Sequence, residues 1–204
     1  KIPILLGTQM VAKGLDFENV TLVGVLAADL SLYADNYHAA ERTFSLLTQV
    51  VGRAGRGDKE GRAVIQTFTP DNEVITAAAA QDYNSFYAAE IRLRRARRYP
   101  PFADVFTFTV SGPEEGAVLR AAAGLREAMR AGVRYPTAAN MQVEIVGPAP
   151  APVVKVNNRF RYRVFWVGRN DHTTRELIAY YLRAFHQKKE NRGMNLFVDC
   201  NGED

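Results

Sequence analysis

Short apolar runs alternate with one amphipathic stretch along the first third of the chain. Residues 2–6, 20–27 and 63–68 are apolar, rich in β-branched side chains, and too short for helices. Such runs are typical of buried parallel strands. Residues 38–51 instead place apolar side chains at helical spacing, and a glycine-rich stretch follows them. Strands that alternate with helices in this way predict an α/β fold with a parallel sheet.

A longer helical stretch follows this first part. Residues 72–98 run from an alanine-rich segment to an arginine-rich one, and Pro100 and Pro101 end the helical pattern. We therefore expect a domain boundary after the prolines. The predicted organisation is a first domain of residues 1–70, a bridging helix and linker of residues 71–101, and a C-terminal domain of residues 102–204.

The second half of the chain has a different order of elements. Residues 104–110 alternate like a half-buried strand, and residues 113–131 have helical spacing that a proline opens and Gly132 closes. A helix over residues 171–190 begins with a Thr173–Glu176 capping box. Strands are predicted at 143–147, 159–167 and 195–200, with a stiff proline loop at 148–154. This β-α-β-β-α-β order predicts a split βαβ sandwich.

Composition excludes several kinds of site. The single cysteine, Cys200, excludes an internal disulfide and a multi-cysteine metal site within the chain. His38, His172 and His186 match no metal-ligand spacing, and no apolar run approaches the length of a membrane span. We therefore expect a cytoplasmic monomer that binds neither a metal nor a membrane. The net charge of +4 suits an anionic partner without requiring one.

The stretch "GTQMVAKGLD" contains a possible phosphate-binding pattern. Thr8 can hydrogen-bond a phosphate oxygen, Gly14 admits close approach, and Asp16 can reach a sugar hydroxyl or the water shell of a nucleotide-bound metal. The alternative is a strand end, a turn glycine and a helix-capping aspartate. This pattern by itself leaves both interpretations open.

The stretch "QVVGRAGR" carries a more specific signal. If the preceding helix continues, Arg53 and Arg56 lie on one face and can flank a transferring phosphoryl group. Gln49, one turn earlier, can orient water or tie the arginines to a carboxylate. The alternative is a basic helix end with a glycine cap. That alternative explains one arginine and one glycine, but not their repeated alternation.

Together, these two stretches resemble motifs V and VI of superfamily 2 helicases. The longer segments "ILLGTQMVAKGLDFENVTLVGVLAAD" and "AERTFSLLTQVVGRAGRG" resemble the PriA family of replication-restart helicases. The resemblance continues through "RYPPF" and "GPAPAPVVKVNNRFRYRV", so it spans essentially the whole chain.

The resemblance implies a piece of a longer enzyme. It places the phosphate-binding loop, the acidic metal motif, the first RecA-like lobe and a zinc module upstream of this chain. ATP, Mg²⁺ and zinc would then bind in the whole protein, with zinc outside this fragment, and the fragment alone would be inactive. The implied fold is the end of the second RecA-like lobe followed by the α+β domain. Because the chain begins without methionine inside an apolar run, we expect a fragment on that ground too.

The implied activity is 3′-to-5′ translocation on single-stranded DNA, fork unwinding and primosome assembly through loader proteins. Two other functions stay open: a non-catalytic nucleic-acid and protein interaction module, and a related superfamily 2 translocase on branched DNA. The residues implied to act on ATP are Arg53 and Arg56 as arginine fingers, Gln49 beside them, and Gly14, Asp16 and Gly52 at the nucleotide, while Thr8 lies on the DNA-phosphate side.

Two further arginine clusters are candidate binding sites. In "RLRRARR", Arg92, Arg95 and Arg98 recur every three residues and can line a DNA backbone, or can simply be a solvated helix end. In "NNRFRYRVFW", strand alternation points Arg159, Arg161 and Arg163 to one face and the residues between them to the other. The ordinary interpretation is aromatics inward and arginines in water.

The resemblance adds a partner for the second cluster. In the PriA family this region lies near the docking site of the acidic tail of single-strand DNA-binding protein. It therefore implies that Arg159 grips that tail, with Arg161 and Arg163 beside it. Arg163 stands where the family can have glutamine. At this position the chain departs from the family pattern, and the resemblance supports the contact of Arg163 less than that of Arg159.

Overall fold

The computed structural model of the protein describes residues 4–8, 20–34, 36–52, 54, 61–133 and 142–202. Contacts within the chain divide it into two compact units, residues 1–93 and 94–204. The boundary between these units falls inside a helix. The three-part division at residues 70 and 101 stays a prediction.

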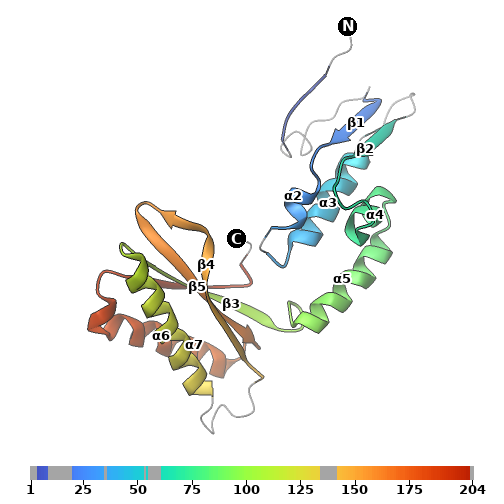
Figure 1. Cartoon of the computed structure of the whole chain (residues 1–204). Helices are drawn as coiled ribbons and strands as arrows, with labels where there is room; N and C mark the ends of the chain where they lie inside the picture. The colour runs from blue at the N-terminus through green and yellow to red at the C-terminus, as the bar shows by residue number, and fades with distance from the viewer. Residues whose placement is uncertain are drawn as a thin grey trace. The chain divides into compact units, whose positions relative to one another are not determined.

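The first unit contains a pair of parallel strands and four helices among its described residues (Figure 1). Strands β1 (Leu22–Val25) and β2 (Arg62–Ile65) pair in register, as the apolar runs at 20–27 and 63–68 predict. The described residues 4–8 form no strand, so the strand predicted at 2–6 is wrong over that range. Ile4 and Leu6 are 88% and 85% exposed, and no described strand pairs with this run.

Four helices accompany the two strands. They are α2 (Asp29–Leu32), α3 (Ala39–Val51), α4 (Glu73–Ala79) and α5 (Tyr83–Arg97). Helix α3 matches the predicted helix at 38–51 and buries Phe44 and Leu47 in the core of this unit. The rings of Phe44 and Phe86 stack with their centroids 4.1 Å apart, which ties α3 to α5.

The single helix predicted over residues 72–98 is in fact two helices. Gln81 has a φ of 55° and breaks the helix between α4 and α5. Asp82 stabilises the break because its carboxylate accepts hydrogen bonds from the Ser85 N–H and the Ser85 hydroxyl, at 3.0 Å and 2.6 Å. An aspartate in this position starts a new helix rather than continuing the old one.

The second unit is a four-stranded antiparallel sheet with the strand order β4-β5-β3-β6. Its elements confirm the predicted β-α-β-β-α-β order and the split βαβ architecture. Helices α6 and α7 cover one face of the sheet (Figure 1). The elements are β3 (Asp104–Gly112), α6 (Glu115–Val133), β4 (Glu144–Val156), β5 (Arg159–Gly168), α7 (His172–Gln187), the short 3-10 helix η2 (Lys189–Asn191) and β6 (Asn195–Cys200).

Two helix-end predictions differ from the structure. Helix α6 continues through Gly132 to Val133, so Gly132 is not its cap. A Cβ at Gly132 would collide with the hydroxyl of Tyr181, which explains why a glycine stands there. Helix α7 is capped by Asp171, which accepts the Thr174 N–H at 2.8 Å, rather than by the predicted Thr173–Glu176 box.

The proline segment also differs from its prediction. Residues 148–154 are part of strand β4, which pairs with β5 through register shifts, and do not form a loop. Strand β4 lies at the edge of the sheet, where a proline that lacks an N–H need not remove a ladder hydrogen bond. Arg126 and Arg130 of α6 donate to the carbonyls of Gly147 and Ile145 and so hold this strand.

The core of the second unit lies between the sheet and the two helices. Phe108, Val110, Val164 and Trp166 project from the central strands into this core and are fully buried. Along β5 the alternation is as the sequence predicts, with aromatic and aliphatic residues toward the helices. The arginines of β5 therefore lie on the opposite, helix-free face of the sheet.

Candidate nucleic-acid and partner interface

The predicted nucleotide-side motif begins at the C-terminal end of α3. Gln49 is exposed in the last turn of the helix, and its Nε2 donates to the Ser45 hydroxyl at 3.3 Å. Gly52 caps the helix with a φ of −68°, so it does not supply the left-handed turn for which a cap glycine is usually needed. A Cβ at Gly52 would lie 3.3 Å from the Thr48 carbonyl oxygen of the same helix, a tight contact.

Most of the remaining residues of the two motifs lie outside the part of the chain that the structure describes. Arg53, Arg56, Gly14 and Asp16 lie outside the described residues, and their roles stay predictions. Thr8 is described as exposed and lies in no helix or strand.

Asp29 is a positioning residue that sequence reasoning missed. It follows β1, and its carboxylate accepts hydrogen bonds from the hydroxyls of Thr67 and Thr69, both at 2.7 Å, and from the Phe68 N–H at 2.9 Å. These bonds, that from Thr67 most of all, lower the pKa of Asp29 from its ordinary 3.8 to about 2. They tie the end of β1 to the end of β2. The sequence signal that could have predicted this contact is an aspartate shortly after one strand and a Thr-Phe-Thr segment shortly after the next.

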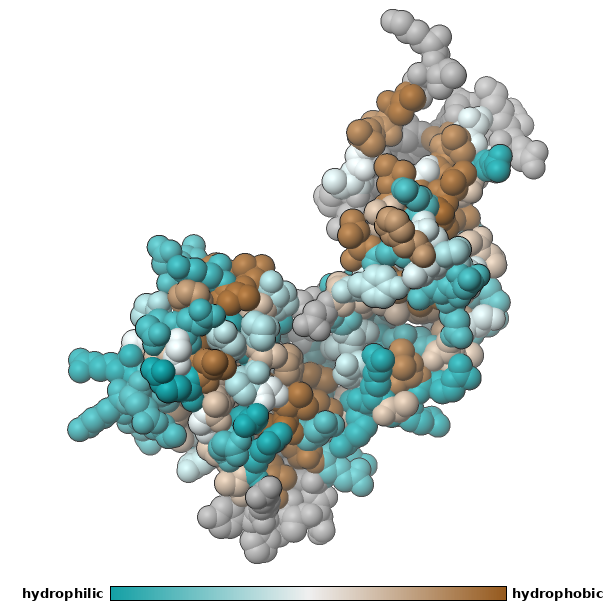
Figure 2. Space-filling view, in the orientation of Figure 1, coloured by the Kyte–Doolittle hydropathy of each residue, from teal (hydrophilic) through white to brown (hydrophobic). Residues whose placement is uncertain are grey.

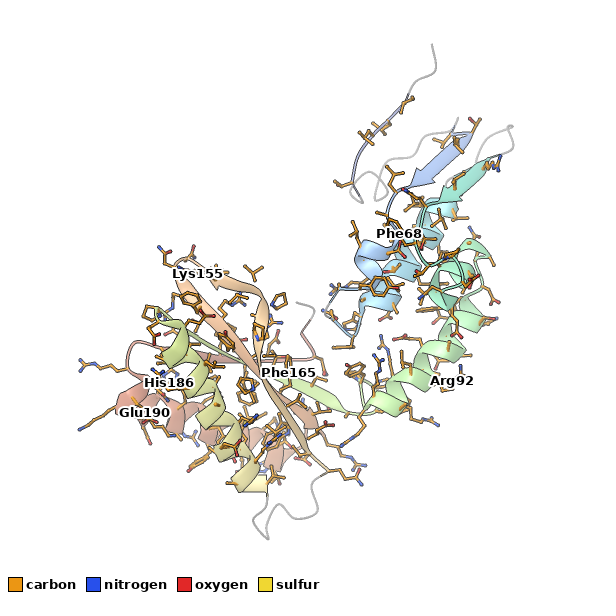
Figure 3. The ribbon with its side chains drawn as sticks, in the orientation of Figure 1. Phe68, Arg92, Lys155, Phe165, His186 and Glu190 are labelled. Atoms are coloured by element: carbon orange, nitrogen blue, oxygen red, sulfur yellow. The ribbon has the colours of Figure 1, made fainter. Side chains whose placement is uncertain are left out.

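The predicted DNA-backbone arginines of α5 have three different settings. Arg92 is exposed on α5 (Figure 3). The guanidinium of Arg95 lies over the ring of Phe102, 4.9 Å from its centroid. Arg98 follows the helix with a φ of 55° and donates to the Gln142 carbonyl, so it does not continue a helical row. DNA binding by these three residues stays a prediction.

The three arginines of β5 share one face of the sheet but differ in burial. Arg159 donates to the Ser111 carbonyl and the Gly193 carbonyl, at 3.0 Å and 2.9 Å, and is half-buried. Arg161 is half-buried opposite Ser111, and Arg163 is only 8% exposed. The face is therefore not a row of fully solvated charges, and the partner roles of the three residues stay predictions.

An exposed aromatic side chain lies on the same face and was missed by the sequence reasoning. Phe197 of β6 is 48% exposed and is paired with Thr109, which is itself paired with Arg163. Alternation in "NLFVDC" was the signal that could have placed it there. Cationic groups beside an exposed aromatic ring on a four-stranded sheet are groups that bind and stack single-stranded nucleic acid.

Two further kinds of feature are absent from the described part of the chain. No three acidic, histidine or cysteine side chains of the described residues are grouped so that they could hold a metal ion. Among the described helices, none combines the length and apolar character needed to cross a membrane.

Comparison with known proteins identifies relatives over nearly the whole chain. The family described as "Primosomal protein N C-terminal domain" matches residues 95–202. "Replication restart protein PriA" of Bacillus subtilis is 38% identical over 201 residues, which are 98% of this chain and 24% of the relative. The proteins of the same name from Rickettsia felis and Synechocystis are 39% and 41% identical and match 89% and 79% of this chain, or 27% and 19% of their own lengths.

The chain thus spans about a quarter of the length of these relatives or less. The family match covers nearly the whole second unit, from the end of α5 through β6, where the split βαβ fold lies. The chain belongs to the PriA family of replication restart proteins.

Proposed function

We propose that this chain works as part of an ATP-dependent 3′-to-5′ DNA helicase that recognises stalled forks and restarts replication by primosome assembly. One observation carries the proposal. The match to the Bacillus subtilis replication restart protein covers 201 of 204 residues, and therefore includes both helicase-like motifs as well as the C-terminal domain.

In this proposal the nucleotide lies at the end of α3. Arg53 and Arg56 reach the γ-phosphate of ATP held with Mg²⁺ by another part of the longer protein, and Gln49 positions them. Gly14, Asp16 and Gly52 form the near side of the same site. Charge develops on the phosphoryl oxygens during transfer, and guanidinium groups stabilise it. Zinc belongs to the longer protein rather than to this chain, and the protein works in the cytoplasm.

DNA and the acidic tail of single-strand DNA-binding protein are the proposed partners of the second unit. The helix-free sheet face supports this because it combines Arg159, Arg161 and Arg163 with the exposed ring of Phe197. Arg92, Arg95 and Arg98 are the proposed backbone contacts, together with Thr8. The arginines attract phosphates or carboxylates, and an aromatic ring stacks on a base or packs on an apolar side chain.

Strand displacement on synthetic forks tests the proposal. A longer family member that contains this chain should unwind the lagging arm with 3′-to-5′ polarity in the presence of ATP, whereas the 204-residue chain alone should neither hydrolyse ATP nor unwind. Turnover by the chain alone contradicts the two-lobe site. Fork binding without unwinding by the longer protein favours the non-catalytic interaction module instead.

A further inference from the structure

The hairpin formed by β4 and β5 carries positive charge that no described carboxylate compensates. Residues 145–170 contain five basic residues and no acidic residue, and Figure 3 shows Lys155 at the tip of the hairpin. The Nζ of Lys155 lies over the ring of Phe160, 4.8 Å from its centroid. Arg159 is held by its Nε and Nη2, while its Nη1 makes no hydrogen bond within the described residues. Neither cation pairs with a carboxylate in the part of the chain that the structure describes.

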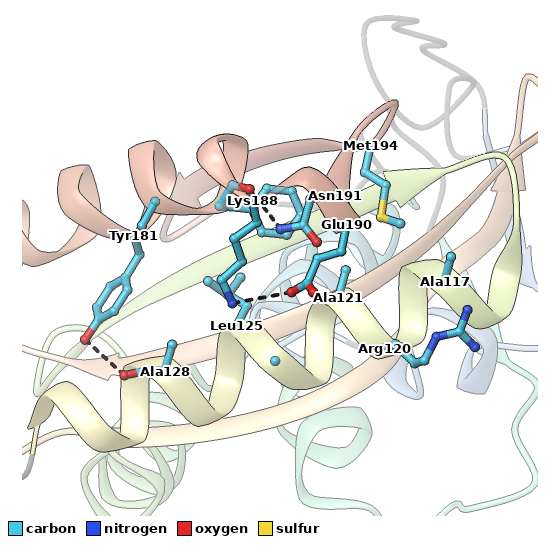
Figure 4. A pocket seen from close by; sticks show the side chains of 13 residues that line it. Ala117, Arg120, Ala121, Leu125, Ala128, Tyr181, Lys188, Glu190, Asn191 and Met194 are labelled. Atoms are coloured by element: carbon cyan, nitrogen blue, oxygen red, sulfur yellow. Dashed lines mark hydrogen bonds and ion pairs between the residues drawn. The ribbon is translucent and has the colours of Figure 1, made fainter.

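Several cations on the helix-covered side of the same unit are instead compensated. Lys188 pairs with Glu190 at 3.7 Å, which Figure 4 shows as a dashed line. Arg120 pairs with Glu114 at the same distance. The hairpin therefore differs from this side, because its cations are available to an anionic partner.

The tip of the hairpin is a tight turn. Asn157 and Asn158 have φ angles of 49° and 58°, and a two-residue turn of type I′ requires positive φ at both positions. Asparagine tolerates this conformation better than most residues. Val156 and Arg159 pair with each other directly across the turn. The hairpin thus ends in a narrow tip of defined geometry.

Cations lie on both faces of this tip. Residues paired across an antiparallel ladder have their side chains on the same face. Lys155 is paired with Phe160, whose ring packs against the core under the helices, so Lys155 lies on the helix-covered side. Arg159, the next residue along β5, lies on the opposite side. A single phosphate backbone along one face would leave the cation of the other face without a partner.

Exposed apolar side chains accompany these cations. Val153 is 58% exposed and Val156 is 38% exposed. Val153 lies in a bulge, where residues 151–154 of β4 stand opposite Arg161 alone, and bulges redirect side chains. Figure 2 shows hydrophobic side chains gathered beside hydrophilic ones over the hairpin. A partner that suits the tip therefore offers an apolar surface with negative charge on both sides of it.

A DNA branch point has these properties. The last base pair before the branch presents a flat apolar face, and two phosphate backbones diverge on either side of it. Proteins that unstack DNA insert apolar side chains at such base steps. A continuous duplex or a single strand would engage one face of the tip only.

We propose that the β4–β5 hairpin binds the point at which duplex DNA separates into two strands. Val153 and Val156 pack on the last base pair, while Lys155 contacts the phosphates of one strand and Arg159 those of the other. This role rests on the proposed DNA function and adds the DNA structure that the hairpin recognises. It also gives the exposed valines a use that binding of an acidic peptide does not require.

Fluorescence of 2-aminopurine tests the contact in the longer protein without ATP. The base is placed either in the last base pair before the branch of a synthetic fork or in the middle of its duplex arm. Fluorescence should rise at the branch alone, because packing of the valines there unstacks the base. An equal rise at both positions, or fork binding without a rise at the branch, overturns the proposal. Because no hydrolysis is needed, the result separates the role of the hairpin from the helicase function.

Protein variants provide the second arm. The double variant Val153→Ser and Val156→Ser should lose the rise at the branch and keep the melting temperature, since both side chains are exposed. Val146→Ser is the matched control, because Val146 is a 45% exposed valine of β4 away from the tip, and its substitution should keep the rise. A wild-type rise in the double variant, or its loss in the control as well, contradicts the site.

Lys155→Ala tests the charge of the tip independently of the valines. It should reduce the slope of log affinity against log salt concentration by about one for the fork, because one phosphate contact is lost. The slope for single-stranded DNA should stay unchanged. Equal changes for both DNAs would contradict recognition of the branch. Loss of acidic-peptide binding with an unchanged fork slope would assign the tip to a protein partner instead.

Discussion

The negative charge of Asp29 stabilises the first unit by joining two of its strand ends. Its three hydrogen-bond donors come from the segment after β2, so the ionised carboxylate joins the ends of two parallel strands. The pKa of Asp29 is about 2 in the folded chain and 3.8 ordinarily. Because the folded-state pKa is depressed, the stabilisation is fully present above pH 3.8 and is lost as the pH falls toward 2.

Asp29→Asn should therefore lower the melting temperature at neutral pH by several degrees and make it less sensitive to acid than the wild type between pH 4 and 2. An amide presents one acceptor and two unwanted donors to the three donor groups. Thermal melting followed by circular dichroism measures this, with Asp71→Asn at an exposed position as the control. Parallel acid profiles for wild type and Asp29→Asn would refute the role.

At the scale of elements, α6 offers two glycines with opposite expected effects. Gly132→Ala should destabilise the second unit, because the added methyl group collides with the buried Tyr181. Gly124→Ala should stabilise it by about 1 kcal/mol, because alanine is the better helix former and its Cβ meets open space. The fluorescence of Trp166, the single tryptophan, reports unfolding here, since its ring lies 6.3 Å from that of Tyr181. Stabilisation by both substitutions would contradict the packing between α6 and α7.

The sheet face makes a separable prediction about DNA. Phe197→Ala should weaken single-stranded DNA binding by about 1–3 kcal/mol if one base stacks on the ring, with an unchanged salt dependence. Arg161→Ala should instead reduce the slope of affinity against salt concentration, because one phosphate contact is lost. Fluorescence anisotropy at several salt concentrations separates the two effects. If both variants keep the wild-type affinity and the wild-type salt dependence, DNA does not bind to this face of the sheet.

The elements that could be predicted from sequence are those that a local pattern determines. Alternation along β5 identified both the strand and the face that carries its arginines, and helical spacing identified α3. The elements predicted wrongly depend on something outside their own pattern. The break before Asp82 depends on a cap, the proline strand on its position at a sheet edge, and Gly132 on Tyr181 from another helix. The roles of Asp29 and Phe197 depend on strand pairing, which brings Asp29 to the threonines after β2 and places Phe197 beside Thr109.

At the scale of the whole molecule, the chain combines a parallel-strand unit with a split βαβ unit and covers about a quarter of its relatives. Family membership rests on the second unit and on the continuous match through the first. In the proposed function, the first unit completes an ATP site with another lobe and contributes Thr8 and Arg92 to the DNA contacts, and the second unit contacts DNA and proteins.

DNA-stimulated ATP turnover of Arg53→Ala and Arg56→Ala, each made in the longer protein, tests this account most directly. Each variant should lose about a thousandfold in turnover, because guanidinium stabilisation of the transferring phosphoryl group is removed, and should keep its affinity for DNA. Arg62→Ala, at an exposed position on β2, is the matched control and should keep both activities. Turnover near the wild-type rate in both arginine variants would contradict the helicase function and leave the chain as a binding module.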